Sequence, residues 1–358
     1  MASVLFSKTA GLNDASYGKI DTPIRMVIMH ESDELSKKQE YIDKIYIREK
    51  SRRFAETIIG GNEFSDFAVT SEGAGAENDS IEETYKQVIS HLQFMKEFTI
   101  TAEMMEDAMY AVGADAKLRA QNFVRAYYRT QTRVSSAILA NGTNNTMDFG
   151  GTIYNIGAPK HESQAVNDPL FTKSHRYGTK NDYDTQSNYY YTTDLAAGTL
   201  TTDKFEAIVN ELSIKLRNMK DESGNALGYA ADTIILPTNR AGLETIAKKV
   251  FASYQLGGGA AGTNLASNLL YNAMTVVIDP MWNTTKNEFM IMSSEANKAL
   301  GGNLFYDRVP LTVESFKDQH TANLVYTGRT RFGAGNGSYK HIIRVTDAAD
   351  GAKAEELA

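Results

Sequence analysis

Residues Thr101 to Gly142, TAEMMEDAMYAVGADAKLRAQNFVRAYYRTQTRVSSAILANG, carry the longest uninterrupted helical pattern in the chain. Thr101 can cap a helix by accepting a backbone N–H bond, and acidic residues follow it where the helix dipole is positive. Asn141 and Gly142 tolerate the left-handed backbone that ends helices. The pattern predicts a rod over residues 115–140, about 40 Å long. Apolar and small residues share one face at three- and four-residue steps: Ala116, Ala120, Phe123, Tyr127, Val134 and Ile138.

A second stripe on this predicted helix is basic. Arg125, Arg129 and Arg133 lie one turn apart, where like charges repel unless water or acidic partners neutralise them. Two interpretations follow from this spacing: a solvated face, or a contact between subunits.

Composition sets limits on the rest. The chain has 358 residues, enough for a large core or for two domains at about 150 residues each. It contains no cysteine, which excludes disulfides and thiolate chemistry. Thirty-seven basic against 44 acidic side chains give a net charge of −7, which argues against a protein that mainly coats nucleic acid. No leader pattern and no run of about 18 apolar residues occurs, so we expect a soluble protein made in a cytoplasm.

The first half of the chain alternates between segments with and without periodicity. Residues 1–45 have too few apolar residues at one period for a domain and predict an arm that lies on something else. Residues 50–98 predict two strands around the acidic, Gly-rich turn SEGAGAENDS, although the second strand also fits helix spacing. Such a hairpin needs a partner, because isolated hairpins are marginally stable. Residues 143–198 are irregular, and NYYYTT (residues 188–193) predicts an aromatic surface with polar edges.

Regular patterns return after residue 200. Strand-like runs halted by Pro237 and Pro280 alternate with helical runs, which predicts an α/β domain over about 200–305. Residues 309–345 predict further strands, and the polar tail after them is expected to be loose.

Sequence motifs typical of catalytic, cofactor-binding and metal-binding sites are weak or absent. Gly257, Gly259 and Gly262 match a dinucleotide loop, but a helical pattern precedes them where that motif requires a strand. No H-E-x-x-H pair, Walker loop or nucleophile elbow occurs. We therefore predict no catalytic residue, no cofactor and no metal site, and no enzyme. The histidines are scattered and lack ligand spacing: His30, His91, His161, His175, His320 and His341.

Five segments in a fixed order carry a resemblance to a known family. They are FTITAEMMEDAMY (98–110), RVSSAILANGT (133–143), ADTIILPTNRAGLETI (231–246), AMTVVIDPMW (273–282) and RTRFGAGNGSYKHIIRV (329–345). Over roughly residues 50–345, the chain resembles the major capsid proteins of tailed bacteriophages, which have the Hong Kong 97-like fold.

This resemblance implies an α+β fold with named parts. They are an N-arm (1–45), an extended E-loop hairpin (46–98), a peripheral domain with a long spine helix and an irregular insertion (99–200), an α/β axial domain (201–308), closing strands of the peripheral domain (309–346) and a flexible tail (347–358). Within the axial domain, the loop at Gly257, Gly258 and Gly259 would lie near the symmetry axis of a capsomer.

The resemblance also implies a function: a major capsid protein that self-assembles into hexamers and pentamers, forming an icosahedral shell around double-stranded DNA. Expected partners are other copies of the chain, a separate scaffolding protein, a portal, decoration proteins and non-specifically packaged DNA, but no membrane. The location would be the virion, after assembly in the host bacterial cytoplasm. Two alternatives stay open: an encapsulin-like nanocompartment, and an α/β enzyme with its site at the strand ends near Pro237 and Pro280.

Two sets of residues are candidates for contacts between subunits. The arginine stripe could pair with acidic E-loop residues of a neighbour, because the charge blocks are complementary: Glu72, Glu77, Glu82 and Glu83. Some shells of this family carry isopeptide crosslinks, for which Lys86 or Lys96 with Asn336 are the candidates here.

Overall fold

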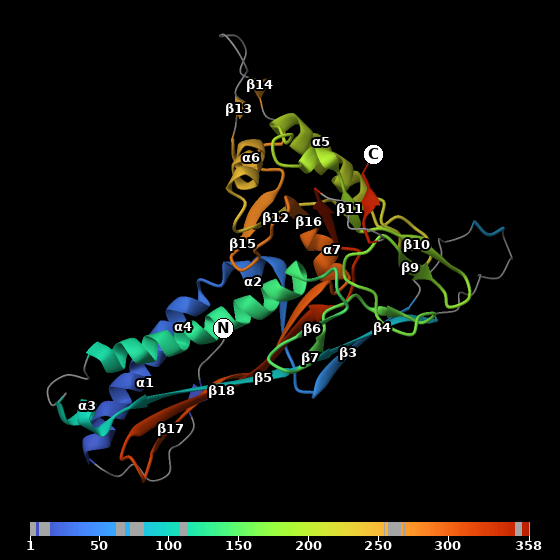
Figure 1. Ribbon diagram of the computed structural model, residues 1–358. Coiled ribbons are helices and arrows are strands. Elements are labelled where there is room, and N and C mark those ends of the chain that lie inside the picture. Colours follow the sequence, from blue (N-terminus) through green and yellow to red (C-terminus); the bar gives the residue numbers. More distant parts are fainter. Residues whose placement is uncertain are drawn as a thin grey trace. The chain divides into compact units, whose positions relative to one another are not determined.

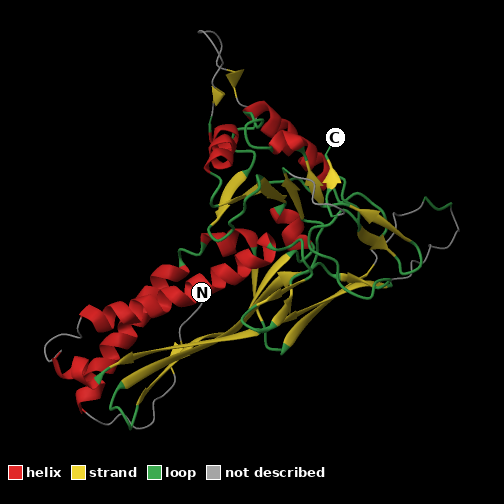
Figure 2. Cartoon of the chain, in the orientation of Figure 1, coloured by secondary structure: helices red, strands yellow, loops and turns green. Residues whose placement is uncertain are grey.

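A computed structural model describes residues 5–6, 15–61, 69–71, 82–107, 114–253, 255–256, 266–267, 270–347 and 353–357 (Figure 1). The chain forms two compact units. The first unit comprises Met1–Ala55, Ser90–Ser135 and Phe305–Ala334, and the second comprises Glu56–Ile89, Ser136–Leu304 and Gly335–Ala358. The chain mixes helices and strands throughout, as Figure 2 shows. The α+β prediction is therefore confirmed.

The first unit combines helices with a five-stranded sheet in which β1, β17, β18 and β5 follow one another and β2 also pairs with β17. Its elements are β1 (Leu5–Phe6), α1 (Ala15–Ser36), α2 (Glu40–Ile45), β2 (Ile47–Lys50), β5 (Leu92–Ile100), α3 (Ala102–Asp107), most of α4 (Ala114–Ala140), β17 (Asn303–Lys317) and β18 (Leu324–Asn336).

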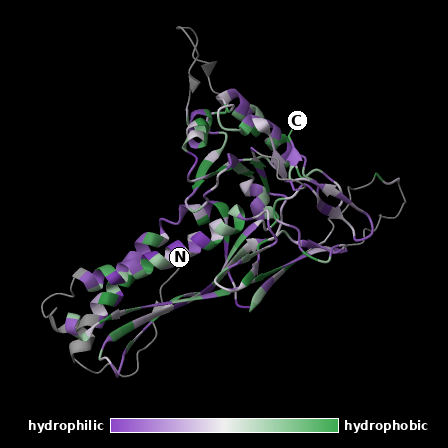
Figure 3. Cartoon of the chain, in the orientation of Figure 1, coloured by the Kyte–Doolittle hydropathy of each residue, from purple (hydrophilic) through white to green (hydrophobic). Residues whose placement is uncertain are grey.

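The predicted rod is α4, which begins one residue before the predicted position and ends where predicted. All six residues of its predicted apolar face are buried. Hydrophilic and hydrophobic residues alternate along it in Figure 3, as expected for an amphipathic helix. The predicted cap is also present, because Thr101 Oγ1 accepts a bond from the Met104 N–H at 3.3 Å. That cap begins the short helix α3, which is separate from α4.

The reason predicted for the end of α4 is wrong. Neither Asn141 nor Gly142 has a positive φ. Instead, Asn141 donates to the Ala137 carbonyl through both its backbone N–H and its Nδ2, and the Gly142 N–H bonds the Leu139 carbonyl at 3.2 Å, which tightens the last turn. A Cβ at Gly142 would lie 2.7 Å from a ring carbon of Phe171. This glycine is therefore required by close packing and not by backbone conformation.

The N-terminal segment differs from its prediction. Residues 15–36 form α1, and its Ile24 and Ile28 are fully buried in the core that α4 and the sheet share. Ser32 Oγ lies 2.8 Å from the Tyr128 hydroxyl of α4, so the two helices also share a buried hydrogen bond. The segment thus packs on its own chain, where we expected it to need another surface. This helix was not predicted from the sequence because Pro23 lies inside it and interrupts the helical pattern.

Strand β5 is paired with β18 in antiparallel register over nine residues, from Ile100 opposite Leu324 to Leu92 opposite Phe332. Stacked rings reinforce the pairing: Phe94 on Phe332 with centroids 4.7 Å apart, and Phe98 on Tyr326 at 4.9 Å.

Gly328 of β18 lies directly under Phe123 of α4. A Cβ at this position would be 2.2 Å from Phe123 Cζ, and the Phe123 ring is itself confined by Phe98 at a centroid distance of 5.1 Å. We expect Gly328→Ala to lower the free energy of unfolding by about 1–3 kcal/mol, the usual cost of overpacking. Thermal unfolding measures this. Gly242→Ala is the matched control, because a Cβ there meets open space within α6, so no loss of stability is expected.

The second unit is built on a six-stranded sheet in the order β15-β12-β16-β19-β11-β20, and it also contains separate sheets of two or three strands. Its elements are β3 (Ala55–Gly61), β4 (Glu83–Ser90), β6 (Thr146–Asp148), β7 (Ile153–Asn155), β8 (Lys160–His161), β9 (His175–Gly178), β10 (Tyr183–Gln186), β11 (Tyr189–Tyr191), η1 (Thr193–Leu195), α5 (Thr202–Arg217), β12 (Thr233–Pro237), α6 (Ala241–Ala252), β13 (Gln255–Leu256), β14 (Ala266–Ser267), β15 (Thr275–Asp279), β16 (Glu288–Met292), α7 (Ser294–Ala299), β19 (Ile342–Thr346) and β20 (Glu355–Glu356).

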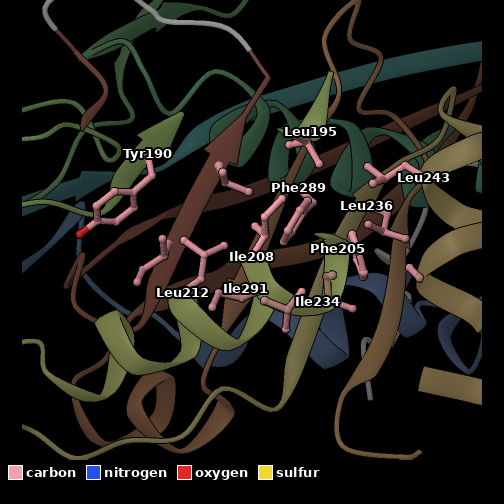
Figure 4. Close-up of a cluster of buried hydrophobic side chains, with 14 of the residues drawn as sticks. Tyr190, Leu195, Phe205, Ile208, Leu212, Ile234, Leu236, Leu243, Phe289 and Ile291 are labelled. Carbon is pink, nitrogen blue, oxygen red and sulfur yellow. The ribbon is translucent and has the colours of Figure 1, made fainter. Parts of the chain in front are cut away.

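The core of this unit lies between the sheet and helices α5 and α6. Phe205 of α5 contacts Phe289 of β16 at a centroid distance of 5.2 Å, and Ile234 of β12 is fully buried beside them (Figure 4). The strands predicted before Pro237 and Pro280 are present as β12 and β15, which pair in parallel. The strand–helix alternation predicted after residue 200 is therefore confirmed.

Two surface predictions for this unit are wrong. Tyr189 and Tyr190, expected on an irregular surface, are buried in β11, which pairs in parallel with β19. The tail was expected to be loose, but Glu355–Glu356 form the edge strand β20 beside β11, and Leu357 packs into the core. The sequence missed both because three-residue and two-residue strands are too short to show a period.

The predicted hairpin is present in part. Residues 55–61 and 83–90 form neighbouring strands β3 and β4, so the extended alternative for the second strand is confirmed, while most of the turn between them lies outside the described residues. Strand β4 also pairs with β8 through Tyr85 opposite His161. The base of the hairpin thus has a partner in its own chain, contrary to expectation.

Candidate intersubunit surface

A groove runs between helix α4 and strand β5 in the first unit. Two adjoining cavities of about 270 and 320 Å³ make it up, and they share Lys96, Phe123, Ala126 and Arg129 in their linings. We call this feature the α4–β5 groove. Between Arg119 and Arg133 it follows α4 for about 21 Å, at 1.5 Å per residue. An extended peptide of about six residues would span that length.

The floor of the groove is apolar. Phe94, Phe123 and Leu311 line it, and Phe94 is fixed by its stack on Phe332. Tyr127 also lines it, and burial raises the pKa of its hydroxyl well above the ordinary value, so this ring stays neutral. A peptide lying here would bury apolar side chains on a preformed surface.

The rim of the groove is basic. Among its lining residues, Lys96, Arg119, Arg129 and Arg133 are cations and Glu97 is the one carboxylate. All five side chains are exposed. Within the described part of the chain, neither Arg129 nor Arg133 has an ion-pair or hydrogen-bond partner. The groove therefore offers positive charge above an apolar floor, which suits an acidic segment.

The three arginines of the predicted stripe do not all face the same surface in the structure. Arg125 faces helix α1, where its Nε donates to Glu31 Oε1 at 2.8 Å. Arg129 and Arg133 face the groove together with Arg119, which sequence reasoning missed. The signal was present, because the residues on this flank recur at steps of three and four: Arg119, Asn122, Ala126, Arg129 and Arg133.

The predicted acidic partners are described only in part. Glu82 and Glu83 are exposed at the start of β4, whereas Glu72 and Glu77 lie outside the described residues. No pairing between these carboxylates and the groove of another copy is tested in a single chain, and it stays a prediction.

The crosslink candidates are poorly placed for a bond between subunits. Lys86 and Lys96 are exposed, but Asn336 is fully buried, and its Nδ2 donates to the Ile156 carbonyl at 3.2 Å. A lysine of another copy cannot reach that carboxamide without opening the unit. We expect assembled particles to give only single-chain bands on a denaturing gel, and a ladder of covalent multimers would contradict this.

Other predicted features carry no site in the part of the chain that is described. Gly257, Gly258 and Gly259 lie outside it, after helix α6 and the two-residue strand β13. The described side chains include no group of three or more histidines and carboxylates that could hold a metal ion. None of the described helices is both long enough and apolar enough to span a bilayer.

A buried ion pair joins the end of α4 to the six-stranded sheet in the second unit. Arg344 of β19 bonds Glu288 of β16 at 2.7 Å, and both side chains are at most 6% exposed. The same guanidinium donates to the Ala140 carbonyl at 2.9 Å, so it satisfies the C-terminal end of α4 where the helix dipole is negative. Sequence reasoning missed this contact, because the two strands and the helix lie far apart along the chain.

Only the comparison with solved structures found proteins similar to this chain. No protein-family model and no curated protein sequence matches it. The capsid of an empty GTA particle matches with a TM-score of 0.52 and 11% identity, covering 87% of this chain and 90% of that one. The capsid structure of Cyanophage P-SCSP1u matches at 0.50 and 12%, covering 86% and 88%. A structure of Mycobacterium phage Patience matches at 0.50 and 13%, covering 99% and 95%.

At these identities the likeness concerns the fold, and it extends over nearly the whole of each chain. The chain has the Hong Kong 97-like capsid fold.

Proposed function

We propose that this protein is a shell-forming capsid protein whose copies assemble into hexamers and pentamers around double-stranded DNA. The observation that carries the proposal is the shared fold over 86–99% of the chain, with 88–95% of the phage and GTA capsid chains covered in return. These neighbours favour a phage-type shell over a nanocompartment or an enzyme. The role is structural, in the virion, after assembly in the host cytoplasm.

The proposed contact between copies uses the α4–β5 groove. Its occupant would be the acidic segment 72–83 of a neighbouring copy, EGAGAENDSIEE, which carries five carboxylates among twelve residues. Charge complementarity supports this pairing, since four cations rim the groove. The single apolar residue with a large side chain in the segment, Ile81, suits the apolar floor. The net charge of −7 suits a container that must not bind its own genome tightly to the wall.

Partners beyond the chain itself follow from the same proposal. A shell that admits DNA needs a portal, and a separate scaffolding protein and decoration proteins are further expected partners. The parts implied by the resemblance (N-arm, E-loop, peripheral domain, axial domain) belong to this proposal too.

Sedimentation velocity of the purified chain tests the proposal. We expect a concentration-dependent transition from small species to one large particle of narrow size distribution, because closed assembly is cooperative. Small oligomers at every protein concentration and ionic strength would contradict it.

A further inference from the structure

The β9–β10 hairpin of the second unit has few backbone ties to the rest of that unit. Strands β9 and β10 form a separate two-stranded sheet and pair only with each other among the described strands. Three of the four β10 residues, Tyr183, Asp184 and Thr185, are exposed. Because isolated hairpins are marginally stable in water, side-chain contacts must hold this one in place.

One such contact is a buried aromatic stack. The His175 ring at the start of β9 lies on the Tyr339 ring with centroids 3.8 Å apart and planes 10° from parallel. The Tyr339 hydroxyl accepts a bond from Gln186 at the end of β10 at 2.9 Å. Tyr339 and its neighbours immediately precede strand β19 of the main sheet, so these contacts dock both strands of the hairpin on the core.

A buried ion pair holds the other end of β9. Glu222 and Lys340 are paired with side chains 5% and 7% exposed, and Glu222 Oε2 accepts the Gly178 N–H at 2.9 Å. The Gly178 carbonyl lies 3.0 Å from His161 Nε2. The end of β9 is thus fixed on both sides by groups that lie outside the hairpin.

The protonation state of His175 is defined by its partners. Its Nε2 lies 3.1 Å from two oxygen acceptors, the Leu170 carbonyl and Asn188 Oδ1, so this nitrogen carries the proton of a neutral ring. Its Nδ1 lies 3.9 Å from Asp168 Oδ2.

Four charged or titratable residues lie around His175. Asp168 precedes β9, Tyr339 and Lys340 precede β19, and Glu222 is paired with Lys340. Burial lowers the pKa of His175 to about 3; the hydrogen bonds to Leu170 and Asn188 act against this shift, and the Lys340 charge acts with it. Burial also raises the pKa of Asp168, the carboxylate nearest to His175 Nδ1.

We propose that the β9–β10 hairpin is an acid-released flap, which stays closed while the His175 ring is neutral and opens when that ring takes up a proton.

The sign follows from linkage. In the open flap His175 is solvated and has an ordinary pKa of about 6.5, whereas in the closed flap its pKa is lower. The closed state therefore binds fewer protons, and its stability is lost as pH falls below about 6.5. Each further pH unit raises the opening equilibrium constant about tenfold. The raised pKa of Asp168 works in the opposite direction, because protonation of this carboxylate favours the closed state as pH falls.

Amide hydrogen exchange of the purified full chain between pH 7.5 and 5.0 tests this, after correction for the intrinsic pH dependence of exchange. For peptides covering β9 and β10, we expect the opening constant to rise about tenfold per pH unit below 6.5. For peptides covering β12 and β16, no such rise is expected. His175→Gln, which keeps an N–H donor but cannot titrate, should abolish the pH dependence. His320→Gln, an exposed histidine in the other unit, should leave it unchanged.

Three results would overturn the proposal. One is a flap whose opening constant is independent of pH in the wild-type protein. Another is a pH dependence that persists in His175→Gln. The third is an equal rise in every peptide, which would mean global acid unfolding. The first and third need no variant, so the test stands even if His175→Gln folds poorly.

Discussion

Replacing Arg129 and Arg133 together by glutamate is expected to abolish particle assembly while leaving the fold of the monomer intact. Both side chains are exposed on the rim of the α4–β5 groove and have no partner among the described residues, so their reversal removes no contact within the chain. An exposed ion pair contributes only about 0.2–1 kcal/mol. The contact repeats at each interface of a shell, however, and multivalency multiplies the loss. Light scattering measures assembly, and circular dichroism measures the fold.

Lys117→Glu is the matched control, because this exposed lysine lies on the same helix and does not line the groove. Its assembly should equal that of the wild type. Glu82→Lys with Glu83→Lys, added to the arginine reversals, should restore part of the assembly if the acidic segment is the occupant. Normal assembly of the Arg129→Glu, Arg133→Glu protein would show that the groove is a solvated surface.

Arg344→Met is expected to lower the free energy of unfolding of the second unit by about 3–5 kcal/mol, the usual cost of leaving one member of a buried ion pair alone. Glu288 would be left as an unpaired carboxylate that is 4% exposed. The Ala140 carbonyl at the end of α4 would also lose its donor. Trp282, the single tryptophan, reports on this site, since its ring lies 5.2 Å from the guanidinium. Urea unfolding followed by tryptophan fluorescence gives the change.

Arg344→Met combined with Glu288→Leu removes both charges and should recover much of the loss, because a buried pair replaced by apolar groups is often nearly neutral. A cost below about 1 kcal/mol for Arg344→Met alone would mean that water reaches Glu288, contrary to its burial.

The long elements were predictable from sequence because their periods extend over many residues. The face of α4, the strands halted by Pro237 and Pro280, and the α5 and α6 helices all follow from spacing and breakers that act locally. The order of these elements then indicated the capsid fold, which structure comparison supports.

The remainder depended on contacts that spacing does not encode. Helix α1 was missed because Pro23 breaks its pattern while Ile24 and Ile28 still reach the core. The β5 side of the candidate groove was not predicted, because β5 lies beside α4 only through its pairing with β18. Arg125 was grouped with Arg129 and Arg133 because a four-residue spacing does not show which neighbouring element each side chain faces. Its partner in the structure, Glu31, lies 94 residues away in the sequence.

Electron microscopy of the purified full-length protein, alone and with a scaffolding protein, is the most direct test of a capsid function. Closed shells, or rings of five and six subunits, are the predicted result. Uniform monomers or dimers under every condition would contradict it, and would make the Hong Kong 97-like fold of this chain a scaffold for some other activity.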